Sequence, residues 1–515
     1  MPRKKYYITT PIYYVNDAPH IGSAYTTITA DVLARFKRLD GYDVFFMTGT
    51  DEYGQKIEKS AREANMAPLD FVNKVSQHFR DLYPIIDATP DAFMRTTDPH
   101  HHKAAQHIWQ CIEENGHIYE STYAGWYAIR DEAFYGEKEL IDGKAPSGAA
   151  VEWVEEPSHF FRLSAWQEPL LEFYRTNPDF ISPESRRNEV MRFVEGGLHD
   201  LSISRSTFNW GIPVPQASDI ASTSDRNPIM YVWLEALTIY LTSLGYPDDF
   251  DEKSQRLWSE SLHLMGKDIL RFHAVYWPAF LMAAGLQPPK KVFAHGWWTN
   301  QGAKISKSLK NTIDPIALIE KYGSDQIRYF LCREVPFGQD GEFSEGALLQ
   351  RINSDLANDF GNLSQRVLSF IQKNAEGKIP QPEEYTEKDQ NILNLCQRTI
   401  DEVRKHADHQ ALSKMCESIW ALVAEGNRYI DAQQPWSLKK TDPLRMNTVL
   451  YVLVEVLRHM GILSQAIVPK AASKLLDQLA VAQDQRNLCH LLDRKLTPGD
   501  TLPVPEGLFP RLQHD

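Results

Sequence analysis

The chain has 515 residues, 43% of them hydrophobic, and a formal net charge of -13. This length and apolar content are sufficient for about two to four domains, each with its own core. The negative charge excludes a nucleic-acid binder that depends on overall basicity, so any RNA contact has to be local. Residues 351–515 are nearly neutral, with 20 basic and 21 acidic side chains, and a basic face remains possible there.

The sequence predicts neither a membrane span nor a secretion signal. The longest charge-free apolar run, residues 272–289, contains His273 and Pro278, and its apolar centre is too short to cross a bilayer comfortably, so we expect a buried helix. The N-terminal MPRKK leads directly into the β-rich YYITT, without the apolar segment of a signal peptide. The five cysteines form no CxxC pair, which argues against a disulfide framework. We therefore expect a cytosolic protein without a membrane partner.

The first 52 residues predict the beginning of a βαβ unit. Residues 6–10 are β-rich, and a helical face follows, formed by Tyr25, Ile28, Val32, Phe36 and Leu39. Residues 43–47 form an apolar run that leads into TGTDE, the pattern of a buried parallel strand whose carboxyl end opens onto a site. A second α/β stretch at residues 263–285 and 292–298 indicates that the same sheet continues after an interruption.

The rest of the chain predicts two further modules. Aromatic strand-like pieces such as residues 123–135 alternate with turn-rich stretches and predict a separate α+β insertion, and long amphipathic stretches from about residue 350 predict a helical bundle. We expect the Pro-rich residues 497–510 to pack as an extended tail. The predicted fold is α/β: a Rossmann-like parallel sheet split by an α+β connective insertion and followed by an α-helical bundle. Its expected parts are 1–115, the first half of the sheet domain; 116–225, the insertion; 226–300, the second half; 301–350, a KISKS loop and linking module; and 351–515, the bundle.

Two elements far apart in the sequence predict a triphosphate site. His20 and Gly22 stand where a loop meets a helix start, and backbone N–H groups at such a terminus attract phosphate, to which His20 would also donate. In GAKISKSLKN, Lys304 and Lys307 are three residues apart and can bracket a triphosphate when the loop closes. Either pattern alone is more often a common turn or a solvated basic loop. One element lies in each half of the sheet, which indicates that they face each other across one crevice. Two phosphate-binding elements at one crevice suggest adenylate formation.

PHIGS resembles the HIGH signature of class I aminoacyl-tRNA synthetases, and KISKS resembles their KMSKS loop. PIYYVN, TGTDEYGQK, WLEAL, GKDILRFH and QQPW extend the resemblance to the methionine-specific family over nearly the whole chain. The resemblance implies a methionine-tRNA ligase that serves protein synthesis, including initiation, with ATP and Mg²⁺ held through the phosphates. It implies His20, Ser23, Lys304 and Lys307 as catalytic residues, and an ATP site formed by His20, Gly22, Ser23, Lys304, Ser306 and Lys307.

The same resemblance implies two further sites. The methionine pocket would consist of Ile12, Tyr14, Asp51, Trp233, Ala236, Tyr240, Ile269 and His273. Asp51 can hold an α-ammonium, and Trp233 and Tyr240 offer the aromatic edges that favour a thioether, although these rings are also typical of an ordinary core. The segments GNLSQR and DAQQPW resemble anticodon-reading elements and imply contacts from Asn362, Arg366 and Trp436. An exposed aromatic ring stacks on an unpaired base, and the alternative for Trp436, after Pro435, is a ring that caps the bundle.

The sequence departs from the family pattern in several places. Ser23 replaces the usual second histidine and carries no positive charge, so His20 and the two lysines would bear more of the transition-state stabilisation. Tyr53 stands where relatives often carry histidine. Residues 116–225 contain no cysteine, so we expect no structural zinc. We interpret the run His100, His101 and His102 as a solvated helix start and predict no metal site there, since adjacent helical residues point in different directions.

Two other classes of function remain open at this level. A small-molecule nucleotidyltransferase or ligase also uses His-x-Gly turns over phosphates, although it has no need for the long helical tail. A catalytically silent RNA-binding paralogue is conceivable because of Ser23. The chain stops soon after LFPRL, without the C-terminal dimerising module of some relatives, and we expect a monomer.

Overall fold

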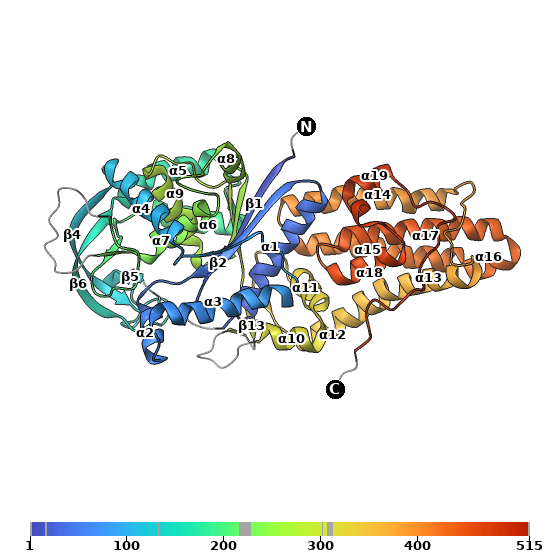
Figure 1. Cartoon of the computed structure of the whole chain (residues 1–515), viewed down its shortest axis with the longest axis horizontal. Coiled ribbons are helices and arrows are strands. Elements are labelled where there is room, and N and C mark those ends of the chain that lie inside the picture. Colours follow the sequence, from blue (N-terminus) through green and yellow to red (C-terminus); the bar gives the residue numbers. More distant parts are fainter. Residues whose placement is uncertain are drawn as a thin grey trace.

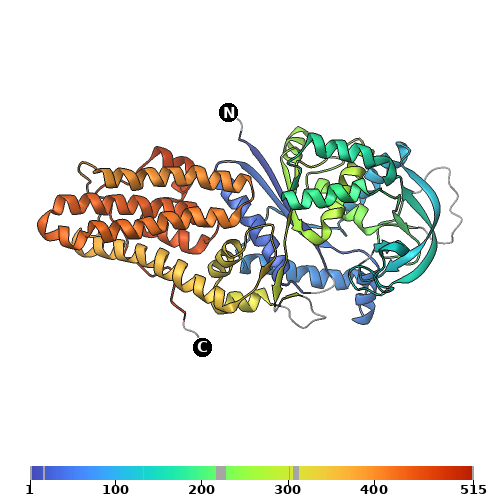
Figure 2. The ribbon, with the colours of Figure 1, turned by 180° about the vertical axis from the view of Figure 1, so that it is seen from behind.

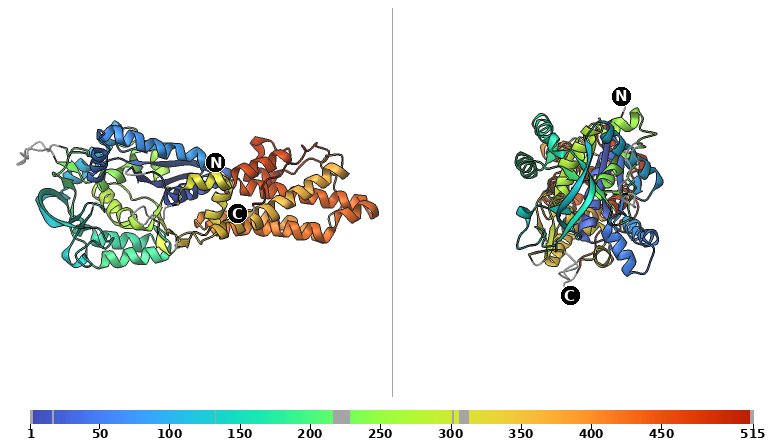
Figure 3. Two further views of the ribbon diagram at one scale, coloured as in Figure 1. Left: turned by 90° about the horizontal axis from the view of Figure 1, so that it is seen from below. Right: turned by 90° about the vertical axis from the view of Figure 1, so that its left-hand side faces the viewer.

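The computed structural model describes residues 3–15, 18–131, 133–215, 228–300, 302–305 and 313–512. The molecule is elongated, with a mixed α/β body at one end and a helical bundle at the other (Figure 1). The view from behind shows the same division (Figure 2), and the view from below shows the bundle projecting from the α/β body along the long axis (Figure 3).

The α/β body is built on one fully parallel sheet. Its order is β3 (Ala92–Arg95), β2 (Asp43–Asp51), β1 (Lys5–Tyr14), β11 (Ser261–Gly266), β12 (Lys291–His295) and β7 (Ile181–Ser182). The chain leaves β1 towards β2 on one side and returns to pair β11 on the other, so the strand order reverses at β1. In open α/β sheets such a reversal leaves a crevice at the carboxyl ends of the strands, where ligands bind. The predicted parallel sheet is therefore confirmed.

The first βαβ unit has the predicted order. β1 is followed by α1 (Ile21–Leu39) and then β2, and the predicted helical face is buried except for the partly buried Leu39. The register between β1 and β2 shifts between Thr9 and Ile12, around Pro11, which has no N–H to donate to a ladder. The irregularity lies directly before the part of β1 that faces the ligand crevice.

Helices cover the sheet as the apolar pattern requires. They include α3 (Pro68–Ile85), α4 (Pro99–Glu114) and α7 (Val232–Thr242). The apolar run at 272–289 forms a π-helical turn (Phe272–Tyr276) and the buried helix α9 (Trp277–Ala283), as expected. The prediction of a solvated start for α4 is wrong for His101, which is fully buried and bonded to Glu235 and Thr242 of α7. The packing of α7 against α4 is the reason.

The insertion carries its own antiparallel sheet. Its order is β5 (Ala133–Tyr135), β4 (Ile118–Ala128), β6 (Glu152–Phe161) and β8 (Leu201–Ser202). One strand of the same sequence range, β7, pairs with β12 and belongs to the edge of the main sheet. The insertion is thus tied to the α/β body by a strand as well as by its two chain crossings.

The C-terminal part is a bundle of long helices. Its main members are α13 (Asn362–Asn374), α14 (Glu387–Asp408), α15 (Leu412–Gln433), α16 (Pro435–Thr441), α17 (Pro443–Ser464) and α18 (Pro469–Gln478). α17 is long and apolar enough to cross a membrane, but 94% of its apolar window is buried inside the protein, as in the core helix of a bundle. The tail packs on the bundle, with Leu502 and Phe509 buried, as predicted.

A buried arginine is one of the residues that join the bundle to the α/β body. Arg328 of α11 (Ser324–Arg333) is fully buried and donates to Asp31 of α1 at 2.7 Å. It also donates to the carbonyls of Ala466 and Ile467, between α17 and α18, at 2.8 and 3.0 Å, and to that of Ile86 at 3.1 Å. Burial alone would raise the pKa of Asp31, but the charges of Arg328 and Arg35, together with the hydrogen bonds from Arg35 and the Thr89 N–H, outweigh burial and lower it.

Candidate active site

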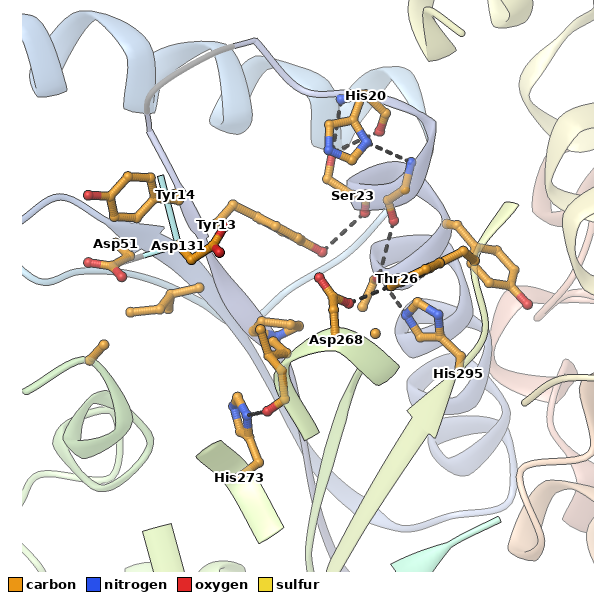
Figure 4. Close-up of a pocket in the computed structure, with 18 of the residues that line it drawn as sticks. Tyr13, Tyr14, His20, Ser23, Thr26, Asp51, Asp131, Asp268, His273 and His295 are labelled. Atoms are coloured by element: carbon orange, nitrogen blue, oxygen red, sulfur yellow. Dashed lines mark hydrogen bonds between the residues drawn. The ribbon is translucent and has the colours of Figure 1, made fainter. Parts of the chain in front are cut away.

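A cavity of about 470 Å³ lies at the carboxyl ends of the parallel strands (Figure 4). The last residues of the four central strands all line it: Tyr14, Asp51, Gly266 and His295. The eight residues predicted to hold methionine also line it without exception: Ile12, Tyr14, Asp51, Trp233, Ala236, Tyr240, Ile269 and His273. His20, Gly22 and Ser23 line the same space. The structure therefore brings residues predicted for the nucleotide site and for the amino-acid site into one cavity.

His20 caps the first turn of α1. The Gly22 N–H donates to His20 Nδ1 at 3.0 Å, so the imidazole ring folds back over the helix terminus. A Cβ atom at position 22 would lie 2.7 Å from His20 Cε1 and 2.9 Å from Nδ1, closer than real Cβ contacts. Glycine is thus needed at position 22 for this ring position. The exposed imidazole and the positive end of the helix dipole face the same region, which suits an anionic ligand.

The Ser23 side chain bonds to the backbone of His20. Its side chain is 5% exposed, and its hydroxyl donates to the His20 carbonyl at 2.8 Å and accepts from the His20 N–H at 3.1 Å. This is a capping box, in which the third residue of a helix secures the residue that caps it. The hydroxyl that replaces the family's second histidine therefore fixes the backbone of His20.

The second basic element begins at the same cavity. A short hairpin of β13 (Trp298–Asn300) and β14 (Ala303–Lys304) leads into it, and Ile305 lines the cavity. Lys304 belongs to β14 by its backbone. Ser306 and Lys307 lie outside the described residues. Ile305, the second residue of KISKS, is thus brought to the cavity that His20 lines.

The amino-acid end of the cavity is formed by β2, α7 and the segment after β11. Asp51 is 8% exposed and lies opposite Tyr14 in the β1–β2 register. Trp233, Ala236 and Tyr240 share one face of α7, as their spacing predicts. The Trp233 ring stacks on Phe272 with centroids 3.7 Å apart and an interplanar angle of 4°. The result is a mostly apolar wall with a carboxylate at one side.

A hydrogen-bond chain and burial together fix the tautomer and the charge of His273. Its Nδ1 lies 3.0 Å from the Ile269 carbonyl, which can only accept, so Nδ1 carries the proton. Nε2 therefore accepts from the Tyr240 hydroxyl at 2.8 Å. Burial lowers the pKa of His273 to about 4. The pocket consequently contains a neutral imidazole at neutral pH.

Several cavity residues were missed by the sequence analysis. Asp268, His295 and Trp297 line the nucleotide side, where the Trp297 Nε1–H donates to Asp268 at 3.2 Å. His295 Nδ1 lies 2.8 Å from the Gly296 carbonyl, so Nε2 accepts from Thr26 of α1 at 2.8 Å. A usable signal existed, since these residues follow the apolar runs of β11 and β12, just as Asp51 ends the run of β2.

The insertion reaches the rim of the cavity. Arg130 and Asp131, two and three residues after the end of β4, line it together with the residues of the sheet, and Figure 4 shows Asp131 among the cavity residues. Arg130 donates to the Ser147 hydroxyl at 2.8 Å, and the Tyr135 hydroxyl donates to Asp131 at 3.1 Å. The turn that faces the cavity is therefore held by contacts within the insertion.

The predicted anticodon residues lie at the other end of the molecule. The Arg366 guanidinium is 5.8 Å from the centroid of the Trp436 ring and donates to Asp431 at 2.6 Å. Trp436 is 43% exposed, more than expected for a ring that only caps the bundle. Asn362 is exposed on α13, one helical turn before Arg366. Among the described residues, no group of three His, Cys, Asp or Glu side chains is arranged to hold a metal ion.

This arrangement of sheet, cavity and bundle fits the architecture of a class I aminoacyl-tRNA synthetase. The family described as "tRNA synthetases class I (M)" matches residues 6–152 and 138–368, and the "Anticodon binding domain of methionyl tRNA ligase" matches 379–515. The chain belongs to the methionyl-tRNA synthetases, and the predicted family is confirmed.

Individual relatives match over the full length. A methionine-tRNA ligase of Brucella suis is 53% identical, with 99% of this chain and 98% of the relative covered. One of Rickettsia bellii is 52% identical, with 99% of both covered. The solved Mycobacterium tuberculosis methionyl-tRNA synthetase in complex with methionyl-adenylate superposes with a TM-score of 0.94 at 48% identity, covering 99% of this chain and all of the other.

Proposed function

We propose that the protein activates methionine with ATP and then transfers it to the 3′ end of methionine tRNA. The observation that carries this proposal is the shared cavity, because His20 and Asp51 line it together with the aromatic wall. Reaction between a carboxylate and a phosphate requires such proximity. The match to the family over both the catalytic and the anticodon-binding parts supports the same activity.

In the proposed first step, Asp51 holds the α-ammonium of methionine. Trp233, Tyr240 and the neutral His273 surround the thioether side chain, and selectivity rests on the shape of this wall, where one methylene is worth about 1–3 kcal/mol. The methionine carboxylate oxygen attacks the α-phosphorus of ATP. The bond to the β-phosphate oxygen breaks, and pyrophosphate leaves with its electron pair.

The phosphate charge is proposed to be stabilised from two sides. His20 and the N-terminus of α1 stand on one side. Lys304 and Lys307 would approach from the other, on the segment that begins beside Ile305, with Ser306 between them. Mg²⁺ enters as part of the ATP substrate, bound through its phosphates.

In the second step, a ribose hydroxyl at the 3′ end of the tRNA attacks the carbonyl carbon of methionyl-adenylate and AMP leaves. The turn at Arg130 and Asp131 gives the insertion direct access to the cavity, which supports its role in guiding the acceptor end. Asn362, Arg366 and Trp436 are proposed to contact the anticodon at the exposed end of the bundle. A stacking ring beside a guanidinium suits an unpaired base.

The test is methionine-dependent exchange of pyrophosphate into ATP, followed by charging of methionine tRNA. His20→Ala should lower the exchange rate by about 10² because one transition-state donor is lost. Trp436→Ala should reduce charging far more than exchange. Exchange that does not require methionine would contradict the proposal and favour a different small-acid ligase. Absence of exchange in the folded protein would favour an RNA-binding paralogue.

We further propose that the protein is a cytosolic monomer without structural zinc. The lack of cysteine in residues 116–225 supports the zinc proposal, because a knuckle needs thiolate ligands. Light scattering should give the mass of one chain, 59.1 kDa. Elemental analysis that finds one zinc per chain would contradict the absence of structural zinc. A dimer mass in solution would contradict the monomer.

A further inference from the structure

A second cavity lies at the end of the bundle farthest from the α/β body. It has a volume of about 410 Å³ and is lined by Thr386, Glu387, Lys388, Ala432, Gln433, Leu438 and Arg445. These residues come from the start of α14, the end of α15, α16 and the start of α17. These segments meet at the tip of the bundle, where α16 lies (Figure 1). Leu438 is two positions after Trp436 on α16, so this short helix separates the cavity from the exposed indole.

Arg445, which lines this cavity, is held by an ion pair with a buried carboxylate. Arg445 donates to both oxygens of Asp389, at 2.5 and 2.7 Å, and the Asp389 side chain is fully buried. Asp389 also accepts from the Tyr429 hydroxyl and the Thr386 N–H. Burial alone would raise the pKa of Asp389, but the bonds from Arg445 and Tyr429 outweigh it and lower the pKa. The guanidinium is therefore locked in one orientation.

The fixed orientation of the Arg445 guanidinium also fixes the orientation of the Gln433 amide. Arg445 donates to Gln433 Oε1 at 2.8 Å. A guanidinium has no acceptor, so Gln433 can only offer its oxygen to Arg445. The planar amide then keeps its NH₂ group on the side away from Arg445, and Gln433 lines the cavity. Gln433 is therefore a donor with a fixed orientation among the lining residues.

The surroundings favour an RNA base as the acceptor. The exposed Trp436, suited to stacking, stands on the same short helix, and Lys439 and Lys440 in its last turn add positive charge for a nucleic-acid backbone. Glu387 lines the cavity as well and would repel a bare phosphate. A base edge that carries both an acceptor and an amino group fits an amide donor and a carboxylate together.

We propose that Gln433 and Glu387 form a subsite for an unpaired nucleotide of the tRNA loop that flanks the anticodon, next to the base stacked on Trp436. The subsite rests on the proposed function, since its ligand is the tRNA that the enzyme charges. Lys388, exposed at the same cavity, contacts the backbone of that nucleotide. The subsite extends recognition beyond Asn362, Arg366 and Trp436.

Two substitutions of Gln433 separate binding from support of Arg445. Gln433→Glu keeps the oxygen that Arg445 binds but removes both N–H donors of the amide. Gln433→Ala removes the oxygen and the donors together. If the amide contacts RNA, both variants should raise the KM for tRNA in charging by about 10-fold, the effect of one or two lost hydrogen bonds. If Gln433 only supports Arg445, Gln433→Glu should charge like the unaltered protein. That result would overturn the proposal.

Loop transcripts with one abasic nucleotide at a time identify the ligand. At one flanking position the abasic tRNA should raise KM as much as Gln433→Ala, and the two changes together should do no more than either alone. Additive effects at every position would overturn the subsite. Charging is normalised to methionine-dependent exchange by the same preparation, so failure of the proposed activity would be seen separately. Gln483→Ala, an exposed glutamine outside the cavity, is the matched control and should leave KM unchanged.

Discussion

Replacing Gly22 by alanine should slow catalysis strongly but change the free energy of unfolding only slightly. The added methyl group would lie 2.7 Å from His20 Cε1, so the imidazole has to turn away and lose the bond from the position-22 N–H to Nδ1. Losing a helix cap costs about 0.5–2 kcal/mol. Alanine in place of glycine within a helix recovers about 0.5–1 kcal/mol. The net effect on the free energy of unfolding should therefore lie between a gain of about 0.5 kcal/mol and a loss of about 1.5 kcal/mol.

The catalytic effect should be much larger. A displaced His20 no longer donates where phosphate charge develops, and the loss of one such donor costs about 10²–10³ in turnover. The measurement is the rate of methionine-dependent pyrophosphate exchange at saturating ATP and methionine, together with urea denaturation of the same preparation. The double variant with His20→Ala should be no slower than either single variant, because both remove the same interaction.

The matched control is Gly346→Ala near the start of α12 (Glu345–Arg351). A Cβ atom there would lie 3.7 Å from the Ser344 hydroxyl, an ordinary contact, and exchange should stay unchanged. If Gly22→Ala exchanged as fast as the unaltered protein, the imidazole position seen here would not matter for catalysis, and the argument for His20 would be refuted.

Other predictions concern the amino-acid pocket and the buried charges. Asp51→Asn should raise the KM for methionine in the exchange assay about 10- to 100-fold, since a charged hydrogen bond is lost; an unchanged KM would remove Asp51 from the pocket. Burial lowers the pKa of His273 and His459 to about 4 and that of His101 to about 3. Because the unfolded chain binds protons that the folded chain excludes, the free energy of unfolding should fall as pH drops from about 6.5 to 4, by up to about 1.4 kcal/mol per pH unit for each histidine. Denaturation midpoints that are equal at pH 7 and pH 5 would contradict this. Arg328→Met should cost about 3–5 kcal/mol in denaturation, because Asp31 keeps a buried charge without its main partner; a cost below about 1 kcal/mol would be inconsistent with this role.

The sequence predicts the parts of the fold that have a local signal. The apolar runs before Asp51 and around residues 292–298 are long enough to identify buried strands, and the spacing of Trp233, Ala236 and Tyr240 places them on one helical face. Family resemblance adds what spacing alone does not provide, namely that Ile12 and Ile269 belong to the same pocket. All of these residues line one cavity.

The features that were missed depend on distant partners. β7 has only two residues, too few for any periodicity, and it joins the main sheet because β12 offers a free edge. His101 can be buried because Glu235, 134 positions later, accepts a hydrogen bond from its ring. The sequence also gives no sign that the Ser23 hydroxyl bonds to the backbone of His20. Pattern reasoning has no access to such pairings.

The guanidinium of Arg328 has a mechanical consequence. Swinging the bundle away from the α/β body would take from this buried cation either the carboxylate of Asp31 or the carbonyl oxygens of Ala466 and Ile467, which lie on opposite sides of the joint. Rotation at this joint is therefore costly, and the span between the His20 imidazole and the tip of α16 is set when the chain folds. The distance between the two ends of the enzyme is therefore fixed. A nucleic acid that contacts both ends has to adapt its own conformation to that distance.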